Sequence, residues 1–408
     1  MGSFNLQDVS ELFKETYGPL SENVYNSFNV TLGRCRKSYT FTGKQKVVAI
    51  PQSFIGGVGS GILPTANYPK TEDAIITAKR LYATCVVERE SMKASSDDKG
   101  AFVRATRYTV QKTVESWMRN MSRTLFGSGT GEIASGDGAT NVSGTGTSVD
   151  PYIVRLNSDT KEANVEEQDY WHYDAESGSA ALLEVVAYDP STREVSLVGT
   201  SAGLAALTGA GPVPTSTFFY MQNSRDNDPQ GLKGVLRATT GNLYSVPVTR
   251  RWSAGVQEDA GGAGITTDML NEDMLEIERK SGKVPTMIVA SYAQYRKILN
   301  LLEDHKRYDL SPRAENLKGK VSFSGVEFMS SRGPIPIFPE RFVEDDALYY
   351  INDNHVEICH RPGMGWFSDD GTVFLRLQDS DDYAARYGGY LETYIVPNFH
   401  GTRWGLAT

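Results

Sequence analysis

The sequence predicts an α+β protein in which strand-rich segments surround one unusually long helix. Residues 97–126 repeat apolar side chains with the spacing of an amphipathic helix. Residues 39–90 contain strand-like runs around a glycine-rich stretch, and residues 127–225 contain several short strands. From residue 226 strands and helices are mixed, and residues 371–408 are again rich in strands. Together these features predict the α+β class.

The composition excludes several classes of protein. The chain has 408 residues, of which 39% are hydrophobic and 22% charged, so it is too apolar to be disordered. No apolar run approaches the ~18 residues that a membrane span needs. Three widely spaced cysteines do not suit a disulfide scaffold. A membrane protein, a small secreted domain and a fibre are therefore excluded.

The net charge of −9 is unevenly distributed along the chain. It amounts to +6 over residues 1–126, −9 over residues 127–260 and −6 over residues 261–408. A basic first third beside acidic remainders suits a surface that faces nucleic acid, or complementary faces that pair between copies of the chain. Scattered, solvated charge is the alternative reading.

Residues 1–38 are expected to form an N-terminal arm. The Gly18-Pro19 pair breaks an early helix-like stretch, and the apolar residues Phe28 and Val30 that follow lack a helical period. Because an extended arm cannot bury such side chains on a core of its own, we expect Phe28 to contact another molecule.

Residues 39–90 are expected to form an extended β-hairpin loop. The strand-like runs 46–50 and 74–78 flank the glycine-rich stretch 55–62. A two-stranded excursion is marginally stable in isolation, so its apolar side chains need a neighbouring molecule. The predicted contacts are Ile50, Ile55, Ile62 and Ile75.

Within the segment 91–126, the helix predicted over residues 97–126 would be about 40–45 Å long at ~1.5 Å per residue. Its apolar face carries Val103, Val110, Val114, Trp117, Met118, Met121 and Leu125. The other face is basic, with Arg104, Arg107, Arg119 and Arg123, and we expect these side chains to contact neighbouring molecules.

The remaining segments are assigned from local patterns. In the β-rich insertion 127–225, strands are predicted over residues 152–156, 181–188, 194–198 and 215–221. The segment 226–370 has predicted helices over 268–280 and 291–303, and a buried strand over 286–290. Further strands are predicted over 326–329, 336–338, 347–351, 356–360, 373–377 and 383–397.

The sequence contains candidate catalytic and phosphate-binding motifs, but each lacks part of the pattern that its chemistry needs. Gly199-Thr-Ser-Ala-Gly203 matches a nucleophile-elbow pattern, so a serine hydrolase using Ser201 and a histidine is one alternative function. The elbow must open a substantial helix, whereas residues 204–207 are followed by a Thr-Gly-Ala-Gly-Pro break. The glycine clusters lack the Lys-Ser/Thr of a phosphate loop.

Metal sites are not indicated either. The five histidines show no metal-ligand spacing, and Asp226–Gly231 lacks the distal glutamate of a calcium loop. We therefore predict no enzyme activity and no catalytic, cofactor or metal site.

The order of these parts resembles the major capsid protein of tailed bacteriophages, which has the Hong Kong 97-type fold. Local sequence carries the resemblance at residues 227–236, 286–299, 324–328 and 394–404. The resemblance implies an N-terminal arm (1–38), an extended loop (39–90), a spine helix of the peripheral domain (91–126), an axial domain with connecting peripheral segments (226–370) and C-terminal peripheral strands (371–408). Residues 127–225 are then an insertion. The chain also begins without a long coiled-coil scaffolding region, which implies a separate or removed scaffolding protein.

The resemblance also implies a function. Such a chain self-assembles into hexamers and pentamers of an icosahedral head that encloses double-stranded DNA without sequence-specific binding. The implied partners are portal and scaffolding proteins and a decoration protein. The resemblance implies neither a cofactor nor contact with a membrane. Assembly in the host cytoplasm and a final location in the virion capsid are implied. We expect the basic segments to pair with acidic segments of adjacent subunits, since the acidic total disfavours tight DNA binding.

Two related readings remain open. An encapsulin-type nanocompartment uses the same fold around a cargo enzyme, although such chains are typically shorter and lack this insertion. A tail or baseplate component would form rings or tubes in place of closed shells.

Overall fold

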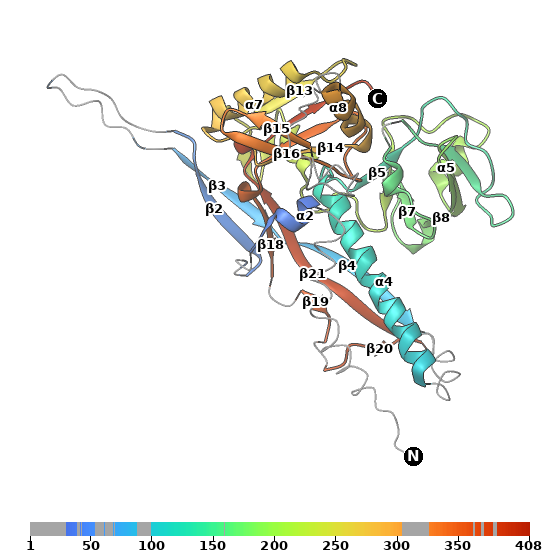
Figure 1. Cartoon of the computed structure of the whole chain (residues 1–408). Helices are drawn as coiled ribbons and strands as arrows, with labels where there is room; N and C mark the ends of the chain where they lie inside the picture. The colour runs from blue at the N-terminus through green and yellow to red at the C-terminus, as the bar shows by residue number, and fades with distance from the viewer. Residues whose placement is uncertain are drawn as a thin grey trace, which may run out of the picture. The chain divides into compact units, whose positions relative to one another are not determined.

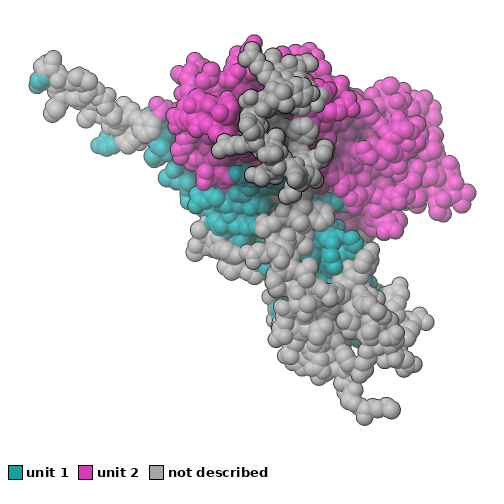
Figure 2. Space-filling model, in the orientation of Figure 1, with its two compact units in different colours: residues 1–125, 227–231, 357–394 teal, residues 126–226, 232–356, 395–408 magenta. Residues whose placement is uncertain are grey.

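The computed structural model describes residues 30–38, 41, 43–53, 61, 68, 70–87, 99–158, 160–303, 326–361, 364–368, 371–377 and 382–408. The chain forms two compact units, coloured separately in Figure 2. Unit 1 consists of Met1–Leu125, Asn227–Gly231 and Glu357–Tyr394. Unit 2 consists of Phe126–Asp226, Leu232–Val356 and Ile395–Thr408. Each unit is therefore assembled from segments that are far apart in the sequence.

The long helix predicted from the sequence is confirmed in unit 1 as α4 (Lys99–Leu125; Figure 1). Its apolar stripe is buried, and Trp117, Met118 and Met121 have no exposed surface. The indole N–H of Trp117 donates to the Leu81 carbonyl over 3.0 Å, and its ring meets the Tyr387 ring edge-on. The helix thus packs on the sheet of unit 1, as its amphipathic pattern requires.

That sheet has six strands arranged around one long strand. Its order is β1 (Arg36–Ser38), β18 (Val356–His360), β21 (Tyr383–Ile395) and β19 (Gly365–Trp366), and β20 (Leu375–Arg376) and β4 (Lys79–Val87) also pair with β21. Strand β4 pairs antiparallel with β21 from Val87↔Tyr383 to Lys79↔Leu391. The sequence placed residues 81–87 in the hairpin, but the structure places them in this sheet.

The predicted hairpin is present as a separate two-stranded sheet in unit 1. Strands β2 (Gln45–Pro51) and β3 (Thr71–Thr77) pair antiparallel in continuous register. Ile50, Ala74 and Ile76 are buried, so one face of the hairpin is covered within the chain. Most of the glycine-rich tip, including Ile55 and Ile62, lies outside the described residues.

The expectation of an arm packed only on other molecules is wrong for residues 30–38. They form a short helix, α2 (Val30–Arg34), and strand β1, which pairs in parallel with β18. Leu32 is completely buried and Cys35 nearly so. Residues 1–29, including Phe28, lie outside the described residues.

Residues 126–226 of unit 2, which include the predicted insertion 127–225, form a β-barrel. Its strand order is β5 (Glu132–Ser135), β10 (Phe218–Met221), β7 (Tyr170–Tyr173), β8 (Leu183–Asp189), β9 (Glu194–Gly199) and β6 (Tyr152–Arg155). A bridge between Gly136 and Leu156 joins the two outer strands, and the Asn157 N–H donates to the Ser135 carbonyl over 2.9 Å. The sheet therefore closes on itself.

The barrel has a hydrophobic core of its own. Trp171, Leu183, Val195, Leu197 and Phe219 are fully buried inside it. Three short helices complete it, α5 (Ala202–Leu207), η1 (Glu162–Asn164) and η2 (Ser179–Ala181). The four predicted strands of the insertion are confirmed as β6, β8, β9 and β10.

The two ends of the barrel lie next to each other. The Asp226 N–H donates to the Thr130 carbonyl over 2.8 Å. Just beyond, the Gly234 N–H donates to the Gly127 carbonyl over 3.2 Å. The chain therefore leaves the barrel where it entered.

The rest of unit 2 (residues 232–356 and 395–408) is a mixed sheet domain. Its sheet runs β13 (Val256–Asp259), β22 (Gly401–Trp404), β17 (Leu348–Ile351), β14 (Met287–Ala290), β16 (Gly333–Pro339) and β15 (Val326–Ser330). The predicted helices are confirmed as α7 (Thr267–Ser281) and α8 (Tyr292–Glu303), and they pack on this sheet. Shorter elements are α6 (Leu232–Leu236), β11 (Asn242–Leu243), β12 (Val246–Pro247), η4 (Asp353–His355) and η5 (Pro397–Phe399).

Local signals explain where α7 begins and ends. The Thr266 hydroxyl accepts a hydrogen bond from the Met269 N–H over 3.2 Å, which caps the first turn. Gly282 follows the last turn in the left-handed conformation, with φ of 73°.

A buried carboxylate, Glu344, is surrounded by basic side chains where the barrel meets the sheet domain within unit 2. It accepts from Lys233 over 2.7 Å and from Arg237 over 2.6 Å, and the Tyr349 hydroxyl donates to it over 3.0 Å. Lys161 of the barrel donates to the Phe342 carbonyl close by. Burial alone would raise the pKa of Glu344, but the charges of Lys161, Lys233 and Arg237 outweigh burial and lower it to about 2.

Candidate functional site

The hairpin has two faces of different character. Val47 and Ile75 are paired in the register, and they lie with Ala49 on the outer face. Val47 is 57% exposed, Ala49 is exposed and Ile75 is half-buried. Ile50, on the inner face, is buried within the chain. The outer face therefore carries an apolar strip (Val47, Ala49 and Ile75) that the single chain does not fully cover, beside polar residues that include the exposed Asp73 opposite Ala49.

The inner face is anchored on β18 by a charged side chain. The Lys46 ammonium lies 2.8 Å from a Glu357 carboxylate oxygen and 3.4 Å from the Cys359 sulfur. Burial would lower the pKa of Lys46, but the hydrogen bond with Glu357 outweighs it, so the pKa is raised. Burial, with Glu357 beside it, raises the pKa of the Cys359 thiol to about 12.

The arginines of α4 occupy two kinds of position. Arg119 and Arg123 are buried within the chain. Arg123 lies 2.9 Å from the Asp228 carboxylate, so its charge is balanced inside unit 1. The side chains of Arg104 and Arg107 lie outside the described part of the helix.

Protein groups hold the segment Asp226–Gly231, whose oxygen-rich sequence resembles part of a calcium loop. Asp228 accepts from Arg123, and the Gln230 N–H donates to Glu392 over 2.6 Å. Burial raises the pKa of Glu392 to about 7, although the hydrogen bonds from the Gln230 and Thr393 backbone N–H groups act to lower it. Over the described ranges, no group of three or more His, Cys, Asp or Glu side chains could hold a metal ion.

Ser201 has a structural position. The residue is 1% exposed, and its hydroxyl accepts from the Leu204 N–H over 3.1 Å, which caps the six-residue helix α5. Among the hydrogen bonds of the described residues, the Ser201 hydroxyl has no histidine partner. His172 of the same barrel contacts the Ala181 carbonyl over 3.0 Å. The geometry therefore lacks the serine–histidine contact that a hydrolase needs.

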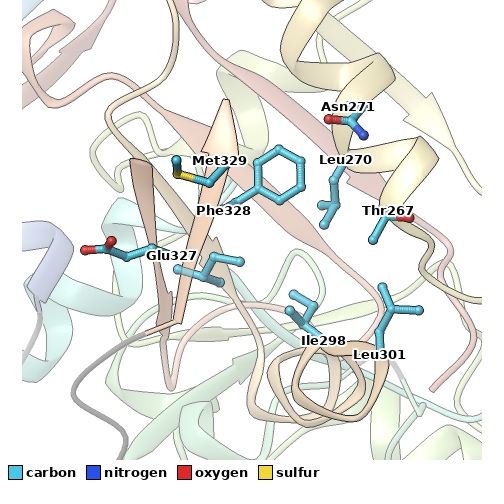
Figure 3. Close-up of a pocket in the computed structure, with 9 residues that line it drawn as sticks. Thr267, Leu270, Asn271, Ile298, Leu301, Glu327, Phe328 and Met329 are labelled. Atoms are coloured by element: carbon cyan, nitrogen blue, oxygen red, sulfur yellow. The ribbon is translucent and has the colours of Figure 1, made fainter. Parts of the chain in front are cut away.

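A cavity of about 320 Å³ lies in the sheet domain between α7, α8 and β15. Its lining is mostly apolar and includes Leu270, Ile298 and Phe328. Figure 3 shows the Phe328 ring beside Leu270, whereas the Glu327 carboxylate points away from it. The residues that line this cavity do not bring titratable groups together, so the cavity has the character of a gap in side-chain packing.

Among the described helices, none is long and apolar enough to cross a membrane.

A search of solved structures finds the same architecture in a phage shell. The capsid of cyanophage A-1(L) matches over 94% of this chain and 95% of that chain, with a TM-score of 0.51 and 12% sequence identity. The chain has the Hong Kong 97-type capsid fold. At this identity the likeness establishes the fold alone.

Other shell proteins match this capsid-fold chain more weakly. The virus-like particle of Pyrococcus furiosus covers 95% of this chain and 98% of that chain at a TM-score of 0.43 and 8% identity. The match to the encapsulin of Synechococcus elongatus covers 91% of this chain and 85% of that chain, at a TM-score of 0.41 and 9% identity. TM-scores below 0.5 are too low to bear on function. No protein-family model and no curated protein sequence matches the chain.

Proposed function

We propose that the chain is the major capsid protein of a tailed bacteriophage, which self-assembles into the hexamers and pentamers of an icosahedral head. The capsid fold over 94% of the chain is the observation that carries this proposal. In this function the protein is structural and encloses double-stranded DNA without reading its sequence. It has no enzyme activity of its own.

The exposed outer face of the hairpin supports assembly. A hairpin whose inner face is fixed to its own subunit can cover a neighbour with its outer face. Val47 and Ile75 gain burial only in such a contact, which is how obligate interfaces are stabilised. A contact of this heterologous kind, repeated around an axis, closes into a ring.

The remaining assignments follow from the same proposal. Residues 39–90 act as the extended loop, 226–370 as the axial domain with connecting segments, and 127–225 as an insertion. Phe28, Ile55, Ile62, Arg104 and Arg107 are proposed contacts beyond the described side chains. Portal and scaffolding proteins and a decoration protein are the proposed partners, with assembly in the host cytoplasm and a final place in the virion.

Negative-stain electron microscopy of the expressed chain tests the proposal. We expect closed shells from the wild type and a loss of shells in Val47→Asp, with unchanged thermal stability of the unassembled chain. Val149→Asp is the matched control, because this valine is 93% exposed in the barrel and lies on another surface. A wild-type chain that stays monomeric would overturn the proposal, and so would rings or tubes. Shells that form around a protein cargo and exclude nucleic acid would indicate a nanocompartment instead.

A further inference from the structure

Three segments of unit 1 meet at the side chain of Glu357. Its carboxylate lies 2.8 Å from the Lys46 ammonium of hairpin strand β2. The Ser38 side chain of β1 is hydrogen-bonded to the same carboxylate. The Cys359 thiol, two residues along β18, is hydrogen-bonded to it as well. One side chain therefore contacts both the end of the N-terminal segment and the base of the hairpin.

Backbone pairing brings the N-terminal segment to β18, and side-chain contacts bring the hairpin base to the same strand. Strand β1 pairs in parallel with β18, and the register places Arg36 opposite Glu357 and Ser38 opposite Cys359. Farther along, the Arg361 guanidinium donates to the Gly43 carbonyl over 2.6 Å, just before β2 begins. The N-terminal segment thus meets β18 through its backbone, the hairpin meets it through side chains, and Glu357 contacts both segments.

The contact is partly shielded from water. The side chains of Lys46 and Glu357 are 16% and 22% exposed. Burial would raise the pKa of Glu357, but the hydrogen bonds with Lys46 and Ser38 outweigh it, so the pKa is lowered. Charge-assisted hydrogen bonds in such surroundings are stronger than bonds at the open surface.

We propose that Glu357 is a positioning residue that fixes, together, the position of the end of the N-terminal segment (β1) and the position of the hairpin base (the start of β2). This inference rests on the proposed function, in which both segments reach neighbouring subunits. Through Glu357 a shift of the hairpin base is transmitted to β1, so the two segments change position as a pair. A subunit that occupies several non-equivalent positions in a shell then needs one coupled adjustment of these two segments in place of two separate adjustments.

Hydrogen exchange on the unassembled chain tests the coupling. In Glu357→Gln we expect exchange to rise roughly tenfold both in residues 30–38 and in β2–β3, the factor expected for losing a charge-assisted hydrogen bond. Lys46→Met should raise exchange in β2–β3 alone, and Ser38→Ala in residues 30–38 alone. Glu357→Asp, which keeps the charge, should restore part of the protection.

The matched control is Glu72→Gln in β3. Glu72 pairs with Lys70 over 2.9 Å in the same hairpin, and the Lys70 side chain is 70% exposed, so this change should alter neither segment. The proposal would be overturned if hydrogen exchange in Glu357→Gln rose in only one of the two segments or in neither of them. It would also be overturned if exchange rose equally in α4.

The size distribution of assembled particles provides the second readout. We expect Glu357→Gln to broaden it relative to the wild type and to Glu72→Gln. A coupled rise in exchange with unchanged particles would restrict the role of Glu357 to the free subunit and contradict its role in assembly. If the wild type forms no shells, the proposed function fails, while the exchange measurement still decides the coupling.

Discussion

Arg403 and Asp273 form a two-bonded ion pair inside the sheet domain of unit 2. One guanidinium nitrogen of Arg403 lies 2.5 Å from Asp273 Oδ1, and Nε lies 2.8 Å from Oδ2. The Tyr350 hydroxyl also donates to Oδ2 over 2.7 Å. Both charged residues are buried, so the pair ties helix α7 to strand β22 without relying on solvent.

Replacing Arg403 by Met should destabilise the protein strongly. The change leaves the Asp273 carboxylate buried without its counter-ion, which costs about 3–5 kcal/mol of unfolding free energy. Glu272→Gln is the control, because Glu272 approaches the same arginine at 3.8 Å but is 76% exposed, and its removal should cost at most ~1 kcal/mol. Urea unfolding measures both, and similar losses in the two variants would contradict the prediction.

Glu344 should stabilise the protein in a defined range of pH. Its pKa is about 2 in the folded chain, below the usual 4.5, so the folded state favours the charged form. The stabilisation is complete above pH 4.5 and is lost as the pH falls towards 2. Glu344→Gln should therefore lower the unfolding free energy near neutral pH, with a difference from the wild type that shrinks on acidification. Urea unfolding at several pH values measures it, and a difference independent of pH would count against this assignment.

Glu392 should show the opposite dependence. Burial raises its pKa to about 7, so the folded chain retains a proton that the unfolded chain loses at about 4.5. Stability is then highest below pH 4.5 and falls as the pH rises to about 7. Glu392→Gln, which keeps an acceptor for the Gln230 N–H, should remove this fall. The same titration of unfolding free energy checks it, and an unchanged fall in the variant would refute the role of Glu392.

Gly199 should be indispensable to the barrel. It adopts φ of 146°, and a Cβ added there would lie 2.0 Å from the Leu182 carbonyl oxygen. We expect Gly199→Ala to lower the melting temperature or prevent folding. Gly209→Ala is the control, because it also has a positive φ of 70° but an added Cβ meets nothing within 4 Å. Equal effects in the two variants would show that backbone strain, rather than the close approach to Leu182, sets the cost.

The sequence predicted those elements whose signal is local. Helix α4 follows the predicted boundaries closely because its apolar repeat and flanking residues are all contained in one stretch. The helices α7 and α8 and strand β14 were predicted for the same reason. These segments need no knowledge of distant partners.

Pairings over long sequence separations were not predictable in this way. Strand β4 lies beside the hairpin in sequence, yet its partner β21 begins at Tyr383. Likewise Leu32 is buried within the chain, and β1 just after it pairs with β18; no pattern within residues 1–38 reveals either feature. Barrel closure depends on backbone contacts around Gly136 and Leu156, which lie just beyond the ends of β5 and β6, and strand periodicity does not reveal them.

The candidate site was predicted in part. The apolar hairpin was recognised, but its exposed face is carried by Val47 and Ile75 while Ile50 is covered. Glu357 was missed because a single acid in a short strand has no distinctive sequence signal. An inward-facing lysine, Lys46, in an otherwise apolar strand was the one available hint that a buried acid would face it.

The adjoining ends of the barrel have an evolutionary consequence. With the Asp226 amide bonded to the Thr130 carbonyl, the barrel begins and ends at one place, as the proposed insertion requires. Domains whose two termini lie close together can be inserted into other domains without disrupting them. A lineage could gain, lose or exchange this domain in one genetic event, leaving the path of the host chain on either side unchanged.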